Sequence, residues 1–372
     1  MQFGLTTVKC GATHVTCFRP FPSVEIVEAL KGVKAFSVAE RMDNPMAQSN
    51  PLTREIKAAF ADAVTGHAGY PEITRIPQIY AGAAGLGSRD LRPGHFIAMT
   101  RNMMNGDGLS YFVVGIDHEL ALTVDEEPDL RPDGGFSMRG HSVGGFGSVT
   151  TNKIIATIVG EVFGKEVQAY PKYGSEKKGL PTTYYLTVAN DRIRTHSELN
   201  YVDFVPLNDV NAFLYGNPLK GLQPGGTVFI QTKKTTPEEV WANVPPKAKA
   251  QIREKNIRVL ALDAAKIALE EAPKADLEVR MQGIVLLGIF LKATPFDEEA
   301  GLSYDEVMTG VKKAVRKYFG NREEAVVKAN LRAIGRGYNE VFELPEACLA
   351  SDITNPSLDP KADLVLFELD IL

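Results

Sequence analysis

Short apolar runs and stretches of helical spacing alternate along residues 1–126. The runs with the pattern of β-strands cover residues 13–18, 33–39 and 76–81. Apolar positions at the spacing of an amphipathic helix cover residues 23–30 and 51–64, and Ser23 is placed to cap the first of these helices. This alternation predicts a mainly parallel sheet with helices on its faces. Because the pattern begins at a strand, we expect an α/β layer that is incomplete at its N-terminus and completed by another polypeptide.

A polar segment separates this pattern from a second one. Residues 104–135 are rich in Asp, Glu, Gly and Pro, which is typical of a linker or domain boundary. Beyond it, strand patterns cover residues 167–170, 183–188, 204–207, 227–231 and 258–262, and helical patterns cover residues 151–163, 263–271, 304–318 and 322–336. The sequence therefore predicts two α/β domains, at residues 1–126 and 136–345. Residues 346–372 form a C-terminal tail of loop composition up to an apolar run at 362–369.

The composition is that of a soluble globular protein. Of the 372 residues, 44% are hydrophobic and 23% are charged, and this length suits two or three domains. The net charge of -5 provides no basic field that would attract nucleic acid or anionic lipid. The longest apolar run, residues 283–291, is about half as long as a membrane helix. The N-terminus has no signal-peptide pattern, so we expect a cytoplasmic protein.

Neither the cysteines nor the histidines form a known metal-binding pattern. Cys10, Cys17 and Cys348 lack metal or iron–sulfur spacing, and the six histidines include no HExxH-type pair. An odd and sparse set of cysteines is typical of reduced thiols. We therefore expect no metal site in this chain, and any metal centre of a redox reaction to lie on another chain.

The strongest local motif is a glycine-rich segment, residues 139–153, that precedes a helical pattern. Its three candidate glycines are Gly144, Gly145 and Gly147. They permit a tight turn before a helix, where free amides and the helix dipole favour an anion such as phosphate. Asn152 and Lys153 add an amide and a positive charge. The segment is neither a Walker loop nor a GxGxxG fingerprint, and a strand-to-helix turn without a ligand is the alternative.

A second motif, residues 173–179, follows a predicted strand and contains Ser175, Lys177 and Lys178. Paired lysines beside glycines suit a phosphate or pyrophosphate group, although a lysine pair on a solvated face is the simpler interpretation of this motif alone. Two such loops at the carboxyl ends of strands in one domain favour a shared ligand. No motif for a nucleophile or an acid–base pair accompanies them, so we expect no catalytic residue in this chain.

These residues, together with Phe18-Arg-Pro-Phe21, the segment 82–93 and Leu222-Gln-Pro-Gly-Gly-Thr-Val228, give the chain a family resemblance. It resembles the 2-oxoacid:ferredoxin oxidoreductases, thiamine-diphosphate enzymes typified by pyruvate:ferredoxin oxidoreductase, over nearly its whole length. The resemblance implies an α/β fold with a transketolase C-terminal-like parallel or mixed sheet layer. A Rossmann-like gamma domain, which supplies much of the coenzyme A site in this family, is expected to follow it.

The resemblance also implies a division of labour between subunits. This chain is expected to bind coenzyme A and support assembly, while thiamine diphosphate, Mg²⁺ and 4Fe–4S clusters lie on partner subunits of alpha, beta and ferredoxin-like type. The implied complex is a hetero-oligomer that oxidises a 2-oxoacid, most often pyruvate, to acyl-CoA and CO₂ and reduces ferredoxin. The isolated chain is expected to be inactive. Carried over by position, the residues expected at coenzyme A phosphates or ribose are Gly147, Asn152, Lys153, Ser175 and Lys177.

Three residues depart from the family pattern. Ser142 stands where many members have a glycine, Glu176 where a lysine is common, and Leu180 where a glycine is common. An alternative is therefore an architectural subunit of a relative that does not use coenzyme A, such as oxalate oxidoreductase. A free-standing Rossmann dehydrogenase is a third class, but the first glycine and the acidic ribose-binding residue of its fingerprint are missing.

Overall fold

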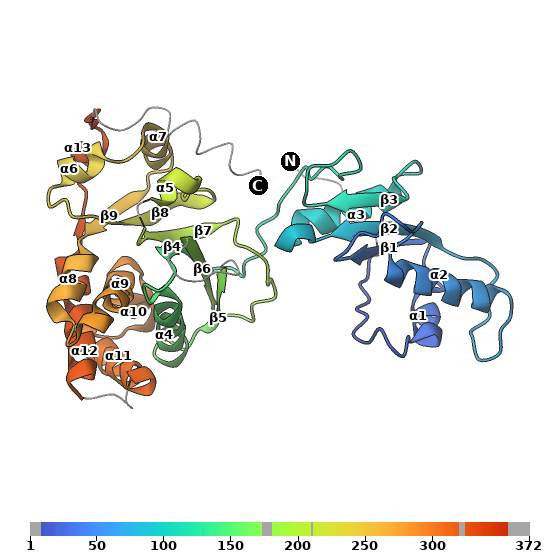
Figure 1. Cartoon of the computed structure of the whole chain (residues 1–372), viewed down its shortest axis with the longest axis horizontal. Coiled ribbons are helices and arrows are strands. Elements are labelled where there is room, and N and C mark those ends of the chain that lie inside the picture. Colours follow the sequence, from blue (N-terminus) through green and yellow to red (C-terminus); the bar gives the residue numbers. More distant parts are fainter. Residues whose placement is uncertain (1–8, 173–180, 210, 320–323, 356–372) are drawn as a thin grey trace. The chain divides into compact units, whose positions relative to one another are not determined.

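The structure is a computed structural model that describes residues 9–172, 181–209, 211–319 and 324–355 (Figure 1). The chain divides into two compact units, residues 1–128 and 129–372. Each unit has its own sheet and its own hydrophobic core. Strands and helices alternate in both units, so the α/β class predicted from the sequence is confirmed.

The first unit contains a three-stranded parallel sheet in the order β1-β2-β3. Its elements are α1 (Ser23–Leu30), β1 (Ala35–Glu40), α2 (Pro51–Val64), β2 (Gln78–Ala84), the 3₁₀ turn η1 (Leu86–Ser88), α3 (Pro93–Met104) and β3 (Tyr111–Val114). Helices α1 and α2 pack Val27 and Phe60 against Phe36 of β1. Met99 of α3 packs with Tyr80 and Phe112 in a separate cluster. The predicted parallel sheet and the helices at 23–30 and 51–64 are therefore confirmed.

Three details predicted for this unit are wrong. Residues 13–18 form no strand. All except Val15 are exposed, and no described strand pairs with them, so their backbone groups would form no sheet hydrogen bonds. Pro22, rather than Ser23, occupies the N-cap of α1. The polar segment 104–135 is not wholly a linker, because it contains β3. This strand has only four residues, too few to change the polar composition of the segment.

The second unit is built on a seven-stranded mixed sheet in the order β10-β9-β8-β7-β4-β6-β5. Its strands are β4 (Phe136–Val143), β5 (Glu166–Lys172), β6 (Pro181–Ala189), β7 (Val202–Leu207), β8 (Leu222–Gln231), β9 (Arg258–Leu262) and β10 (Phe342–Glu343). Strands β4, β7, β8 and β9 run parallel, β6 is antiparallel to β4 and β5, and β10 is antiparallel to β9. All five predicted strands are present. Strand β4 was not predicted, because it buries Ser137 and Ser142 and so lacks an apolar alternation.

Helices cover both faces of this sheet (Figure 1). One face packs against α4 (Ser148–Glu161), α8 (Ala264–Glu271), α9 (Glu278–Ala293), α10 (Phe296–Ala300), α11 (Tyr304–Phe319) and α12 (Glu324–Glu340). The other packs against α5 (Ala212–Tyr215), α6 (Pro237–Ala242), α7 (Pro246–Glu254) and α13 (Glu346–Leu349). Phe204 and its neighbour Val205 belong to opposite cores, as the alternation of a strand buried on both faces requires.

Helix α9 lies at the centre of the first core. The short 3₁₀ turn η2 (Ala275–Leu277) precedes it, and the apolar run at 283–291 forms its middle, where every residue is buried. Gly288 faces the Ile334 carbonyl and Gly337 faces the Val285 carbonyl, each so closely that an added Cβ would overlap the oxygen. Because α9 is apolar on all sides, it has no amphipathic period, and the sequence pattern did not predict it as a helix.

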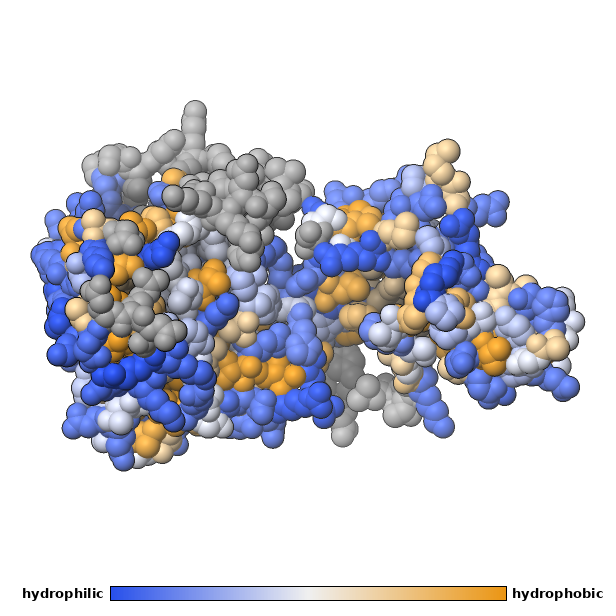
Figure 2. Space-filling view, turned by 60° about the horizontal axis from the view of Figure 1, so that its bottom comes forward, coloured by the Kyte–Doolittle hydropathy of each residue, from blue (hydrophilic) through white to orange (hydrophobic). Residues whose placement is uncertain are grey.

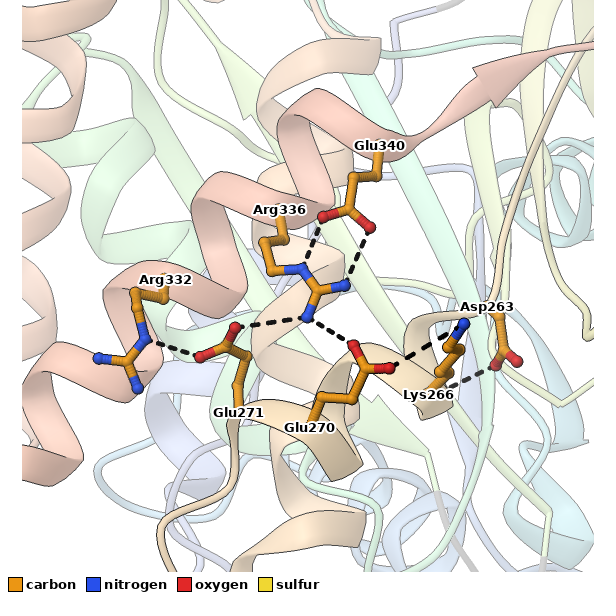
Figure 3. A network of polar contacts seen from close by, with 7 residues as sticks. All are labelled: Asp263, Lys266, Glu270, Glu271, Arg332, Arg336 and Glu340. Carbon is orange, nitrogen blue, oxygen red and sulfur yellow. Dashed lines mark hydrogen bonds and ion pairs between the residues drawn. The ribbon is translucent and has the colours of Figure 1, made fainter.

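Charged residues join α8 to α12 at the surface of this core (Figure 3). The Arg336 guanidinium donates to Glu340, at 2.6 Å, and to Glu270, at 2.8 Å, and Arg332 donates to Glu271 at 2.7 Å. Burial by itself would raise the pKa of Glu271. The hydrogen bonds from Arg332 and Arg336 outweigh burial, and the pKa of this carboxyl lies below its ordinary value. The folded state therefore favours the ionised form of Glu271.

The face of the molecule shown in Figure 2 is mainly hydrophilic, with apolar residues in separate patches. In the described part of the chain, no helix combines the length and the apolar character that a membrane span requires.

We expect Arg336→Met to lower the free energy of unfolding by about 1–2 kcal/mol at pH 7, because it leaves Glu270 and Glu271 without their shared partner. Because the pKa of Glu271 is lowered in the folded state, its ionised form stabilises the fold at pH values above the unfolded-state pKa, about 4. This stabilisation is lost as the pH falls through the folded-state pKa. In denaturant titrations, the free energies of unfolding of wild type and Arg336→Met should therefore become equal below about pH 4. Arg316→Met, which removes an exposed pair with Glu324, is the control and should change stability by less than about 0.5 kcal/mol.

Candidate functional site

The strand that leads into the glycine-rich motif and the strand that precedes the second motif end at the same edge of the seven-stranded sheet. Strands β4 and β5 are both antiparallel to β6, so they point in the same direction and their carboxyl ends meet at this edge. His141 of β4 and Lys172 of β5 flank Thr183 of β6 in the register. Two strand spacings, about 10 Å, thus separate His141 from Lys172, the last described residue before the second motif. Ser175, Lys177 and Lys178 lie outside the described residues.

The glycine-rich segment forms a turn between β4 and α4. The Phe146 amide donates to the Val143 carbonyl at 3.2 Å, and the first bond into the helix runs from the Thr151 amide to the Gly147 carbonyl at 2.9 Å. Gly145 and Gly147 have φ angles of 99° and 81°, which favour glycine. The turn itself therefore requires glycine at positions 145 and 147. Gly144 is buried in the same turn but does not have a positive φ angle.

No described side chain caps the start of α4, as is also true of α1, α7 and α9, whereas some other helix starts in this chain have a side-chain acceptor. Glu40 accepts from the Leu52 and Thr53 amides of α2, Thr236 caps α6, and Asp263 caps α8. The amides of residues 148–150 precede the first intrahelical bond and have no such acceptor among the described residues. These amides and the positive end of the helix dipole form a place suited to an anion.

Asn152 and Lys153, both predicted for this site, have different environments. The Asn152 side chain is only 3% exposed, and its Nδ2 donates to the Tyr185 carbonyl of β6 at 2.9 Å. Lys153 is exposed on the first turns of α4, with no side-chain hydrogen bond or ion pair to another described residue. Asn152 thus attaches α4 to the sheet, whereas Lys153 provides a positive charge that is open to a ligand.

Several buried polar atoms near this turn have no hydrogen-bond partner in the described part of the chain. They are Oγ of Ser142, Oγ1 of Thr151, Oδ1 of Asn152 and Nε2 of His141. Burial and the nearby Arg139 lower the pKa of His141 to about 3, so its ring is neutral at physiological pH. A buried polar atom without a partner costs about 1–3 kcal/mol, so this concentration favours a location where water or ligand atoms complete the bonding.

The first turn of α9 closes one side of the glycine turn, a contact that the sequence analysis missed. A Cβ added to Gly147 would lie 2.5 Å from the Arg280 carbonyl oxygen, and one added to Gly283 would lie 2.4 Å from Oγ1 of Thr151. Gly147 therefore permits a close backbone approach that a side chain would obstruct. Gly283 lies against the Thr151 hydroxyl, and its added Cβ would also lie 3.2 Å from the Gly147 carbonyl carbon. No local signal could reveal it, because the two segments are far apart in the sequence and α9 itself was not predicted.

No group of three or more His, Cys, Asp or Glu residues within the described ranges is arranged to hold a metal ion.

Two family models match the chain. One, described as pyruvate ferredoxin/flavodoxin oxidoreductase, matches residues 137–340, and the other, described as pyruvate:ferredoxin oxidoreductase core domain II, matches residues 5–93. The second unit therefore corresponds to the first of these models over most of its described length.

Curated relatives match over most of this chain. The pyruvate-flavodoxin oxidoreductase of Trichormus variabilis is 28% identical over 341 residues, which are 90% of this chain and 27% of the relative. The pyruvate:ferredoxin oxidoreductase of Moorella thermoacetica is 25% identical, with the same two shares. The chain thus spans about a quarter of the length of these relatives. Pyruvate oxidoreductase subunit PORC from Thermotoga maritima covers 57% of this chain and 99% of its own, with 23% identity and a TM-score of 0.41.

We expect Gly147→Ala to destabilise the protein by more than about 2 kcal/mol, because it combines a strained φ with overlap against the Arg280 carbonyl. Gly164→Ala is the matched control: its φ is 67°, and an added Cβ has no atom within 4 Å. That variant should lose only about 1 kcal/mol, the cost of the φ angle alone. Equal losses in chemical denaturation of the two variants would show that the contact with α9 contributes nothing.

Proposed function

Because the chain belongs to the pyruvate ferredoxin/flavodoxin oxidoreductase family, we propose that it is the coenzyme A-binding part of a 2-oxoacid:ferredoxin oxidoreductase. Pyruvate is the proposed 2-oxoacid, since the relatives named above are pyruvate oxidoreductases. The chain acts as one subunit of a cytoplasmic hetero-oligomer. Thiamine diphosphate with Mg²⁺ and the 4Fe–4S clusters are proposed on partner subunits, and ferredoxin is the proposed acceptor.

One observation carries this proposal: α4 begins without a side-chain cap, directly after a glycine turn at the carboxyl edge of the sheet. Coenzyme A carries several phosphate charges, which suit free amides, a helix dipole and the exposed Lys153. Lys172 and Pro181, on either side of the second motif, belong to the same edge, which supports a role for Lys177 and Lys178 in the same site.

The proposed role of this chain is to bind and orient coenzyme A. When bound, coenzyme A supplies the thiol that accepts the acyl group. The amides of residues 148–150 and the Lys153 ammonium hold phosphate oxygens, which anchors the cofactor away from its thiol. The buried Oγ of Ser142 and Oδ1 of Asn152 are polar groups that remain available to ordered water beneath the turn.

An architectural subunit of a relative that does not use coenzyme A, such as oxalate oxidoreductase, is the second candidate. Two observations favour it: Gly147 is required for packing against α9, and the Asn152 amide is bonded within the unit. Ser142 and Glu176, which replace a glycine and a lysine common in the family, also agree with it. In this alternative, changes in the loops impair assembly or stability and leave any dependence on coenzyme A unaltered.

We expect Lys153→Ala and Lys177→Ala each to raise the apparent KM for coenzyme A about tenfold in the assembled enzyme, because each removes a phosphate-binding charge worth about 1.4 kcal/mol. The KM for the 2-oxoacid should not change. Dye reduction by the natively purified complex, with a panel of 2-oxoacids and varied coenzyme A, measures both constants.

Lys312→Ala is the matched control. It removes an exposed lysine from α11, two residues from Gly310, which packs against Val162 just beyond the opposite end of α4. Two results would support the architectural alternative instead. One is dye reduction that proceeds equally well without coenzyme A, and the other is an unchanged apparent KM for coenzyme A in the loop variants.

A further inference from the structure

We propose that Arg280, on the first turn of α9, binds a phosphate group of the ligand held at the glycine turn. This inference rests on the proposed function and adds to it a binding residue from a distant part of the chain. Arg280 belongs to neither candidate motif.

The backbone geometry places Arg280 beside the turn. A Cβ added to Gly147 would lie 3.2 Å from the Arg280 Cα as well as 2.5 Å from its carbonyl oxygen. Gly283 directs its missing side chain at Thr151 and at the Gly147 backbone. Residues three apart share one face of a helix, so the Arg280 side chain leaves α9 on the face that carries Gly283, one turn closer to the helix start. Helix side chains also tilt toward the N-terminus, which directs the Arg280 side chain toward the outer rim of the turn.

The electrostatic surroundings favour an anion at this rim. Helix α9, like α4, begins without a side-chain cap, so the positive ends of two helix dipoles meet where Gly147 contacts Arg280. Glu278 also lies in the first turn of α9, but a separation of two residues places it about 200° around the helix from Arg280. The acidic side chain is therefore directed away from the glycine turn.

Arg280 is also free to bind a ligand. It is exposed and forms no hydrogen bond or ion pair with another described residue. Arg316, Arg332 and Arg336, on the neighbouring helices, all pair with glutamates. A guanidinium suits a phosphate because it can donate two parallel hydrogen bonds to its oxygens. Arg280 thus adds a positive charge beside the glycine turn.

The test is titration calorimetry on the full chain with coenzyme A and, separately, with inorganic pyrophosphate. Arg280→Gln should weaken both ligands about tenfold, about 1.4 kcal/mol, since both require the phosphate contact. Arg280→Lys should restore part of the affinity for both ligands. Added salt should reduce the difference in affinity between wild type and Arg280→Gln, because salt screens the charge of the guanidinium. Thermal unfolding should show no change, because the side chain is exposed and supports no described contact.

Lys292→Gln is the matched control, since it removes a cation from the last turn of the same helix, about 18 Å away. If Lys292→Gln weakens ligand binding as much as Arg280→Gln does, the effect is one of overall charge, and the proposal for Arg280 is overturned. If Lys153→Ala weakens coenzyme A and Arg280→Gln does not, the inference fails while the proposed function stands. If the wild-type chain and its assembled complex bind no coenzyme A, the proposed function fails and this inference with it.

Discussion

The close approach of two backbones, at the glycine turn after β4 and at the first turn of α9, determines the geometry of the candidate site. Gly147 and Gly283 make it possible, because any side chain at either position would overlap atoms of the other segment. The contact fixes the direction of α4 at its first turn, so the free amides of residues 148–150 are held in place before a ligand arrives. Such preorganisation lowers the conformational cost of binding.

The packing of the second unit supports this contact from behind. Helix α9 is buried along its middle and meets α12 through Gly288 and Gly337, and the ion pairs of Arg336 join α12 to α8. These helices cover one face of the sheet that ends in the glycine turn. An apolar core therefore lies beneath an edge where several buried polar atoms have no partner among the described residues, an arrangement typical of a binding site on an α/β sheet.

Family membership and site geometry contribute different parts of the functional argument. The matches to two family models identify the chain as a member of an oxidoreductase family, but the chain spans only about a quarter of its curated relatives. The uncapped start of α4 points to an anion without identifying it. Coenzyme A is proposed because the family and the anion-binding geometry agree. Asn152 is buried at this site, and its Nδ2 donates to the Tyr185 carbonyl.

Local patterns were sufficient for elements that bury one face or form a compact apolar strand, such as α1, α2 and β9, whose bounds match the predicted ranges. The same patterns identified the glycine turn, because its φ angles are a local requirement. They could not identify α9, which is apolar on all sides, or β4, which buries serines. Nor could they bring Arg280 to Gly147, since contacts between distant segments depend on the packing of the whole core, and no short stretch of sequence encodes that packing.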